Sequence, residues 1–238
     1  MSRHLETEIE KLKKAILSLT AVVEDRVQKA VRSLEERNPD LAREVIDGDA
    51  EIDQAEVDIE EECLKILALH QPVAVDLRFI IAVLHINNDI ERVGDLGVNM
   101  AERSLFLCTQ EPIPIPFDLA GMHRKALAML GHSLDALMKM DANLARQVRA
   151  ADDEVDEMNR EMYAKVSESA RRNPEHIEIF LSYLSASRHL ERIADYATNI
   201  AEEIVYLIEG EIIRHKPALP EGLGVSQHET VRPPQSKH

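Results

Sequence analysis

Apolar residues recur at spacings of three and four along most of the chain, which is the periodicity of amphipathic α-helices. Leu5, Ile9, Leu12 and Ile16 begin one such stripe. The pattern predicts an all-α protein. The six helices expected cover residues 3–36, 40–69, 72–107, 118–140, 143–172 and 174–209.

Proline marks the boundaries between these helices. Asn38-Pro39 and Asn173-Pro174 interrupt the periodicity, and residues 109–117 read TQEPIPIPF. Alternating prolines block both a helix and a sheet ladder. We therefore expect four segments, which are a first three-helix bundle over 1–108, a Pro-rich linker over 109–117, a second three-helix bundle over 118–210 and a disordered tail over 211–238.

The two halves of the chain repeat each other. Residues 90–102 read IERVGDLGVNMAE and residues 190–202 read LERIADYATNIAE, an offset of 100. In the preceding helix of each half, Asp49 and Asp53 match Asp152 and Asp156 at an offset of 103. The repeat predicts two tandem, repeat-related three-helix bundles.

Small residues interrupt the apolar stripe of the third helix in each half. Gly94 and Gly97 stand where the second half has Ala194 and Ala197. A glycine inside a helix costs about 1 kcal/mol relative to alanine. The shared demand for a small residue predicts that another helix passes close to these positions.

Carboxylates spaced four apart lie beside the apolar stripe. Glu91 and Asp95 form such a pair on the third predicted helix, and Asp49 and Asp53 form one on the second. Neighbours of like charge on a helix repel, so four carboxylates that meet need relief from Arg or Lys, from protonation or from metal ions. Oxygen ligands suit Mg²⁺, Ca²⁺, Mn²⁺ and iron, and suit zinc less well. A solvated acidic face explains the same residues without a ligand.

The charge and hydropathy of the chain limit the classes of partner that we expect it to bind. The formal net charge of −16 repels phosphate backbones, so nucleic acid is not an expected partner. The N-terminus is charged from the outset, and the longest apolar run, over residues 79–84, is far short of the ~20 residues that span a bilayer. Cys63 and Cys108 have no metal-site spacing, which favours reduced thiols in the cytosol.

The sequence lacks the motifs of the enzyme classes considered below. A di-iron carboxylate enzyme on a helical bundle needs Glu-x-x-His, and none of the ten histidines has a glutamate three residues before it. Gly-rich phosphate loops and Gly-x-Ser-x-Gly are also missing from the sequence. We therefore expect a protein that is not an enzyme. A metal-free structural dimerisation or adaptor bundle remains an alternative function.

The motifs described above resemble those of the PhoU family. Its hallmark is a duplicated three-helix bundle with an E/D-x-x-x-D motif in each half, and Glu91–Asp95 and Glu191–Asp195 match that motif. Asp76-Leu77-Arg78 is similar to a further family signature, whereas the second half reads His176-Ile177-Glu178 there. The resemblance covers residues 3 to 210.

The resemblance implies a function, partners and ligands. The chain would be a cytoplasmic, homodimeric negative regulator of phosphate signalling and phosphate transport, which binds a phosphate ABC transporter ATPase and a sensor histidine kinase. Some family members carry iron or zinc clusters on the motif carboxylates. The implied metal ligands are Asp49, Asp53, Glu91, Asp95, Asp152, Asp156, Glu191 and Asp195. Asn99, Glu102, Asn199 and Glu202 are additional candidates.

Overall fold

The computed structural model describes residues 3–114 and 117–210, and within these ranges the only regular elements are helices. The expected tail over 211–238 and residues 115–116 of the expected linker lie outside the described residues. The described remainder of the linker lies outside the helices, between Cys108 and Leu119.

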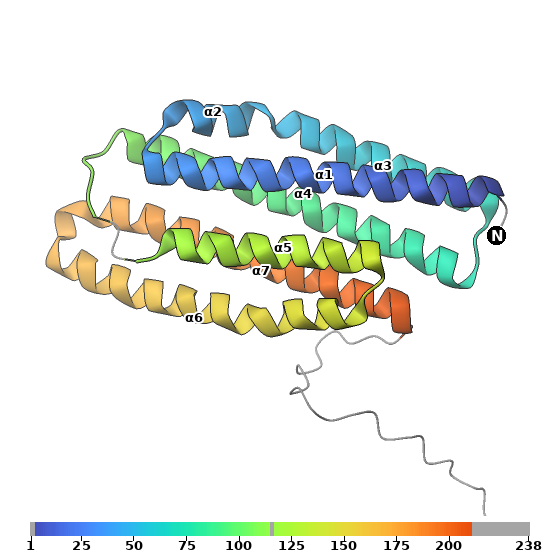
Figure 1. The fold of residues 1–238 in the computed structure, drawn as a ribbon. Coiled ribbons are helices and arrows are strands. Elements are labelled where there is room, and N and C mark those ends of the chain that lie inside the picture. Colours follow the sequence, from blue (N-terminus) through green and yellow to red (C-terminus); the bar gives the residue numbers. More distant parts are fainter. Residues whose placement is uncertain (1–2, 115–116, 211–238) are drawn as a thin grey trace, which may run out of the picture.

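The helices form two three-helix bundles that lie side by side (Figure 1). The predicted all-α fold class is confirmed, and all six predicted ranges are helical, although the second is divided into two helices. The first half contains α1 (Arg3–Glu36), α2 (Pro39–Asp47), α3 (Asp49–His70) and α4 (Ala74–Cys108). The second half contains α5 (Leu119–Lys139), α6 (Ala142–Arg172), the short 3₁₀ helix η1 (Pro174–His176) and α7 (Ile177–Glu209).

Equivalent side-chain caps begin the second helical segment of each half. The Asn38 side chain accepts hydrogen bonds from the backbone N–H groups of Asp40 and Leu41, at 3.0 and 3.3 Å. Asp141, 103 residues later, does the same at the start of α6. These caps satisfy amide groups that the first turn of a helix leaves without partners, so the position of the turn is encoded locally.

The predicted helix over residues 40–69 is interrupted at Gly48, so a single helix was wrong for this segment. Arg26 of α1 lies against Gly48, where a Cβ atom would stand 1.3 Å from its guanidinium nitrogen. The guanidinium donates to the backbone oxygen of Val45 at 3.3 Å and pairs with Glu51 at 2.8 Å. The Val45 oxygen is the one that the Asp49 N–H would bond in a continuous helix. The second half has Ala151 in place of Gly48, and α6 continues unbroken.

The small residues of α4 lie where another helix approaches, as predicted. A Cβ atom on Gly97 would stand 3.7 Å from the Cα atom of Val27, so the backbone of α1 passes directly over this turn. A Cβ atom on Gly94 would stand 3.2 Å from the Ile52 side chain of α3. Gly94 and Gly97 are buried, as are Ala194 and Ala197.

The bundles meet along α4 and α7, which run antiparallel at the centre of the molecule (Figure 1). His85 of α4 pairs with Glu203 of α7, with 3.3 Å between Nδ1 and Oε2. Each of these two helices therefore packs against its own bundle and against its counterpart. No helix within the described residues is long and apolar enough to cross a membrane.

Two substitutions at Gly97 test the close approach. Gly97→Ala places a methyl group at ordinary contact distance and is a better helix former. The free energy of unfolding of this variant should therefore be between 0 and about 1 kcal/mol higher than that of the wild type. Gly97→Leu forces α1 away, so the free energy of unfolding should fall by about 1–3 kcal/mol. Urea denaturation followed by circular dichroism measures both, and a leucine variant as stable as wild type would contradict this packing.

Candidate functional site

Carboxylates of α3 and α4 meet in the first half of the molecule. Burial raises the pKa of Asp49, and the charges of Asp53 and Asp95 raise it further. The pKa of Glu91 is raised by burial and then by Asp95, Glu56 and Asp53. Since Asp53 acts on Asp49, Glu56, Glu91 and Asp95, the four predicted residues and Glu56 form one group, which we term the first acidic cluster.

Carboxylates of α6 and α7 meet in the same way in the second half. Burial, followed by the charges of Asp195 and Asp156, raises the pKa of Asp152 to about 6. The pKa of Glu191 is raised by burial, by Asp195 and by Asp156. Asp152, Asp156, Glu191 and Asp195 are termed the second acidic cluster.

The two clusters differ because of the helix break at Gly48. Asp49 is the first residue of α3, where exposed amide groups favour a negative charge, and Arg26 offsets part of the rise in its pKa. Asp152 lies inside the continuous α6, and the charges that act on it most strongly are all carboxylates. The second cluster is therefore the one with less compensation for its negative charge.

Buried polar side chains fix the register of the helices that carry the clusters. Asn87 of α4 donates from Nδ2 to the backbone oxygen of Glu56 on α3, at 2.9 Å. At the repeat-related positions, Ser187 of α7 donates to Oδ1 of Asn159 on α6, at 3.0 Å. Asn87 and Ser187 stand one helical turn before Glu91 and Glu191, respectively. The two hydrogen bonds therefore hold the helix register that brings the carboxylates together.

Arginines next to the motifs relieve the repulsion only in part. Arg92 lowers the pKa of Glu91 and of Asp95, and Arg192 does so for Glu191 and Asp195. The pKa of each of these carboxyls is nevertheless raised, with burial as the largest cause. The arginines therefore do not offset the combined effect of burial and neighbouring carboxylates at either cluster.

The additional candidate ligands make other contacts. Asn99 donates to the backbone oxygen of Asp95 at 2.9 Å, and Glu202 pairs with Arg149 at 3.0 Å. A metal ion would have to draw Glu202 away from that arginine. Glu102 and Asn199 are exposed on α4 and α7.

Glu56 is the cluster member that the sequence analysis missed. It continues the spacing of Asp49 and Asp53 along one face of α3, which was a usable signal. Its repeat counterpart is Asn159, so a search restricted to carboxylates shared by both halves passes over it.

The donor chemistry of the clusters fits hard cations, because every side-chain donor is a carboxylate oxygen. Their geometry is open: over residues 3–114 and 117–210, no three His, Cys, Asp or Glu side chains are grouped closely enough to hold a metal ion. An ion at either cluster would require the carboxylates to rotate toward it.

Comparisons with known proteins agree with this architecture. A family model described as the PhoU domain matches twice, over residues 16–104 and 119–204. The crystal structure of PhoU from Pseudomonas aeruginosa superimposes with a TM-score of 0.84 at 34% identity, over 87% of this chain and 99% of that one. The phosphate transport system regulatory protein PhoU from Streptococcus pneumoniae gives a TM-score of 0.78 at 31% identity, over 87% and 98%.

Curated relatives extend the likeness over nearly the whole length of each protein. The phosphate-specific transport system accessory protein PhoU homolog of Aquifex aeolicus is 36% identical, over 88% of this chain and 95% of its own. The PhoU protein of Escherichia coli, also named as an accessory protein of phosphate-specific transport, is 30% identical over 90% and 89%. With both halves matched by the family model and a relative 36% identical over 88% of the chain, this chain belongs to the PhoU family.

Proposed function

We propose that this protein is a negative regulator of phosphate signalling and phosphate transport, which acts in the cytoplasm by binding other proteins. Its partners are the ATPase of a phosphate ABC transporter and a sensor histidine kinase, and it works as a homodimer. The observation that carries the proposal is the near full-length similarity to proteins named as accessory to phosphate-specific transport.

The surface suits binding rather than a reaction. The cluster carboxylates lie on exposed or half-buried helix faces, with Asp95 and Asp195 both exposed. Helices of 31 to 35 residues, as α4, α6 and α7 are, extend for roughly 50 Å and present long faces to a partner. The net charge of −16 favours partner surfaces that are basic.

The proposal includes metal ions at the two acidic clusters. Carboxylates that raise one another's pKa gain most from a cation, which would replace mutual repulsion by attraction. Iron, zinc, manganese, magnesium and calcium all accept such oxygen donors. Ions would hold α3 to α4 and α6 to α7, and would thereby set the shape of the binding face.

A metal-free adaptor bundle is the second candidate. The observation that favours it is the open arrangement of the clusters, since no trio of ligands stands ready among the described residues. Under this alternative the carboxylates are a solvated recognition surface, and protonation and arginines are their only relief.

A substitution at Asp152 tests the uncompensated charge in metal-free protein. The folded-state pKa of about 6 lies above the ordinary value of 3.8, so folding binds protons between these values and stability falls as the pH rises through that window. Asp152→Asn should raise the free energy of unfolding at pH 7 by about 1–2 kcal/mol after allowance for solvent screening. The gain should vanish below a pH of about 4.

The control for this experiment is Glu61→Gln, which removes an exposed charge of α3 outside the clusters. Chemical denaturation at several pH values measures each variant. A gain for Asp152→Asn that is the same at low and neutral pH would contradict the electrostatic cause.

A paired substitution tests the metal sites. Asp95→Ala plus Asp195→Ala should leave the circular dichroism spectrum near that of wild type and remove most of the bound metal, and each single substitution should remove about half. The control, Glu61→Ala plus Glu161→Ala, removes the same formal charge from exposed positions on α3 and α6. Elemental analysis of the purified proteins measures the metal, and a double aspartate variant with its full metal load would refute the assignment.

Partner capture tests the regulatory role. The tagged protein, purified from cells grown with and without abundant phosphate, should retain a phosphate transporter ATPase or a sensor kinase identified by mass spectrometry. Capture should depend on the phosphate supply, and the paired aspartate variant should alter it while the bundles stay folded. Recovery of neither partner in either condition would argue against the proposal.

A further inference from the structure

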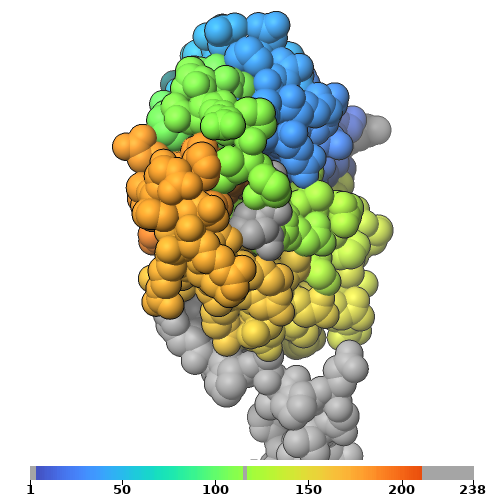
Figure 2. Space-filling view, turned by 90° about the vertical axis from the view of Figure 1, so that its left-hand side faces the viewer, coloured from blue at the N-terminus to red at the C-terminus, as the bar shows by residue number. Residues whose placement is uncertain are grey.

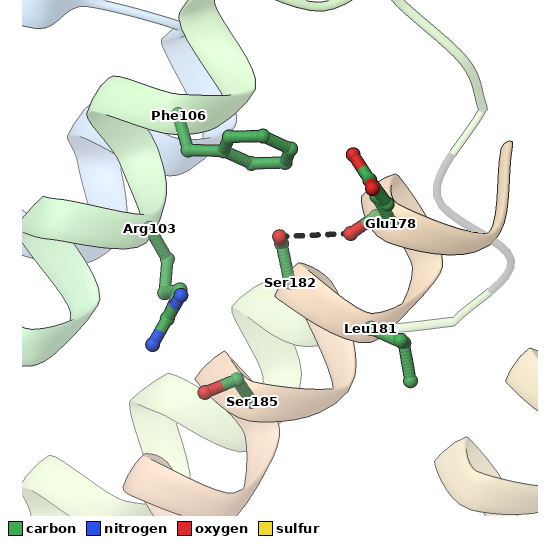
Figure 3. Close-up of a pocket in the computed structure, with 6 residues that line it drawn as sticks. All are labelled: Arg103, Phe106, Glu178, Leu181, Ser182 and Ser185. Carbon is green, nitrogen blue, oxygen red and sulfur yellow. Dashed lines mark hydrogen bonds between the residues drawn. The ribbon is translucent and has the colours of Figure 1, made fainter.

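A pocket lies where the last turns of α4 meet the first turns of α7, which adjoin each other at this end of the molecule (green and orange in Figure 2). Its volume is about 490 Å³. It is lined by Arg103, Phe106, Glu178, Leu181, Ser182 and Ser185 (Figure 3). A second hollow of about 340 Å³ shares Leu181 and Ser185 and extends along α7 to Arg188, His189 and Arg192. We term the two together the arginine groove.

Three guanidinium groups converge on this groove from two helices. Arg103 comes from α4, and Arg188 and Arg192 stand one turn apart on α7. All three act on His189, whose pKa is lowered to about 4 first by burial and then by these arginines. The imidazole is therefore neutral at pH 7, and the positive charge of the groove belongs to the arginines.

The groove offers hydrogen-bond donors that the fold does not use. Within residues 3–114 and 117–210, neither Arg103 nor Arg188 forms an ion pair or a hydrogen bond, while Arg192 donates to the hydroxyl of Tyr196 at 3.3 Å. His189 shares a hydrogen bond with Ser185 at 3.2 Å, and its Nδ1 atom is buried without a partner. Figure 3 shows the Arg103 side chain extending toward Ser185.

Acidic groups near the groove lie at its margins. Glu178 lines the end beside Phe106, away from the guanidinium group of Arg103 (Figure 3). Glu191 of the second acidic cluster interacts with Arg188 and Arg192 but does not line either hollow. The net charge of −16 repels anions at long range, yet that field is screened within about 8 Å at physiological ionic strength, so the local arginines decide binding.

The internal repeat shows that the α4–α7 contact does not itself require these arginines. The residue that matches Arg103 at an offset of 100 is Glu203, and the residue that matches Ser185 is His85. At that opposite end of the helix pair, Glu203 is only 4% exposed and pairs with His85. One end is closed by the contact between His85 and Glu203, whereas the other gathers arginines around open space. Glu191 at the margin offsets part of the charge of Arg188 and Arg192, and an anionic ligand in the groove would supply a counter-charge for Arg103 as well.

We propose that the arginine groove binds a phosphate-type oxyanion, either inorganic phosphate or the phosphoryl group of a small phosphomonoester. The planar guanidinium groups of Arg103 and Arg188 match phosphate oxygens as paired donors, and the hydroxyl of Ser185 adds another. Phe106 and Leu181 supply apolar surface for the organic part of a phosphomonoester. The inference goes beyond the proposed regulatory function, because it gives the chain its own means of responding to phosphate, away from the acidic clusters.

Titration calorimetry on chelator-treated protein tests the site. Inorganic phosphate and phenyl phosphate serve as the two probes, and tighter binding of phenyl phosphate would identify a phosphomonoester as the preferred source. We expect one site per chain, weaker binding at higher salt, and a loss of about tenfold or more in affinity for either Arg103→Ala or Arg188→Ala. Circular dichroism checks that the variants remain folded.

Arg92→Ala is the matched control. Arg92 is the repeat counterpart of Arg192 and adjoins an acidic cluster in the same way, but it does not line the groove. Its removal should leave phosphate binding unchanged. Equal losses for Arg92→Ala and Arg103→Ala would show a diffuse charge effect and overturn the proposal.

Two further outcomes would also overturn it. Phosphate binding that appears only after metal is restored would assign the anion to a metal ion at the acidic clusters. No binding of either probe at millimolar concentration, together with loss of partner capture by Arg103→Ala, would make the groove a docking site for an acidic protein. In that last case the oxyanion inference fails while the regulatory function stands.

Discussion

The structure depends on the double burial of α4 and α7, which pack against their own bundles and against each other. Helices with neighbours on two sides leave only a narrow stripe for polar residues. On that stripe stand Glu91 and Asp95, with Glu191 and Asp195 at the equivalent places, and it lies against the acidic faces of α3 and α6. The repulsion at the two clusters is therefore imposed by the apolar packing, which holds the carboxylates together against their own electrostatics.

Divergence between the halves gives this repeated scaffold its distinct surfaces. Gly48 and Arg26 break the second helical segment of the first half and bring compensation to Asp49, whereas Ala151 keeps α6 continuous and leaves Asp152 among carboxylates. Arg103 and Glu203 carry opposite charges at the two ends of the α4–α7 contact. Duplication thus supplied the frame, and differences at matched positions give its two ends different surfaces.

The local features of the fold were predictable from the sequence, because periodicity, caps and proline breaks act within one helix. The helix break at Gly48 was not predicted, since the guanidinium group that bonds to the Val45 oxygen there belongs to Arg26, which is distant in the sequence and comes from α1. Comparing the two halves identified the carboxylates that both share. It passed over Glu56, because the matching residue in the second half is Asn159. The arginine groove was missed for a related reason: it arises where the halves differ, and only the antiparallel packing of α4 on α7 brings Arg103 to Arg188.

The central claim is that helix packing forces like charges together at the second acidic cluster. The most direct measurement is an NMR titration of carboxyl carbons in metal-free protein, which reads the protonation of Asp152 itself. The structure predicts a midpoint near pH 6 for Asp152, raised first by burial and then by the charges of Asp195 and Asp156. A midpoint close to the ordinary value of 3.8 would show that packing neither buries this carboxyl nor brings the other carboxylates to it, and the account of the second cluster would fail.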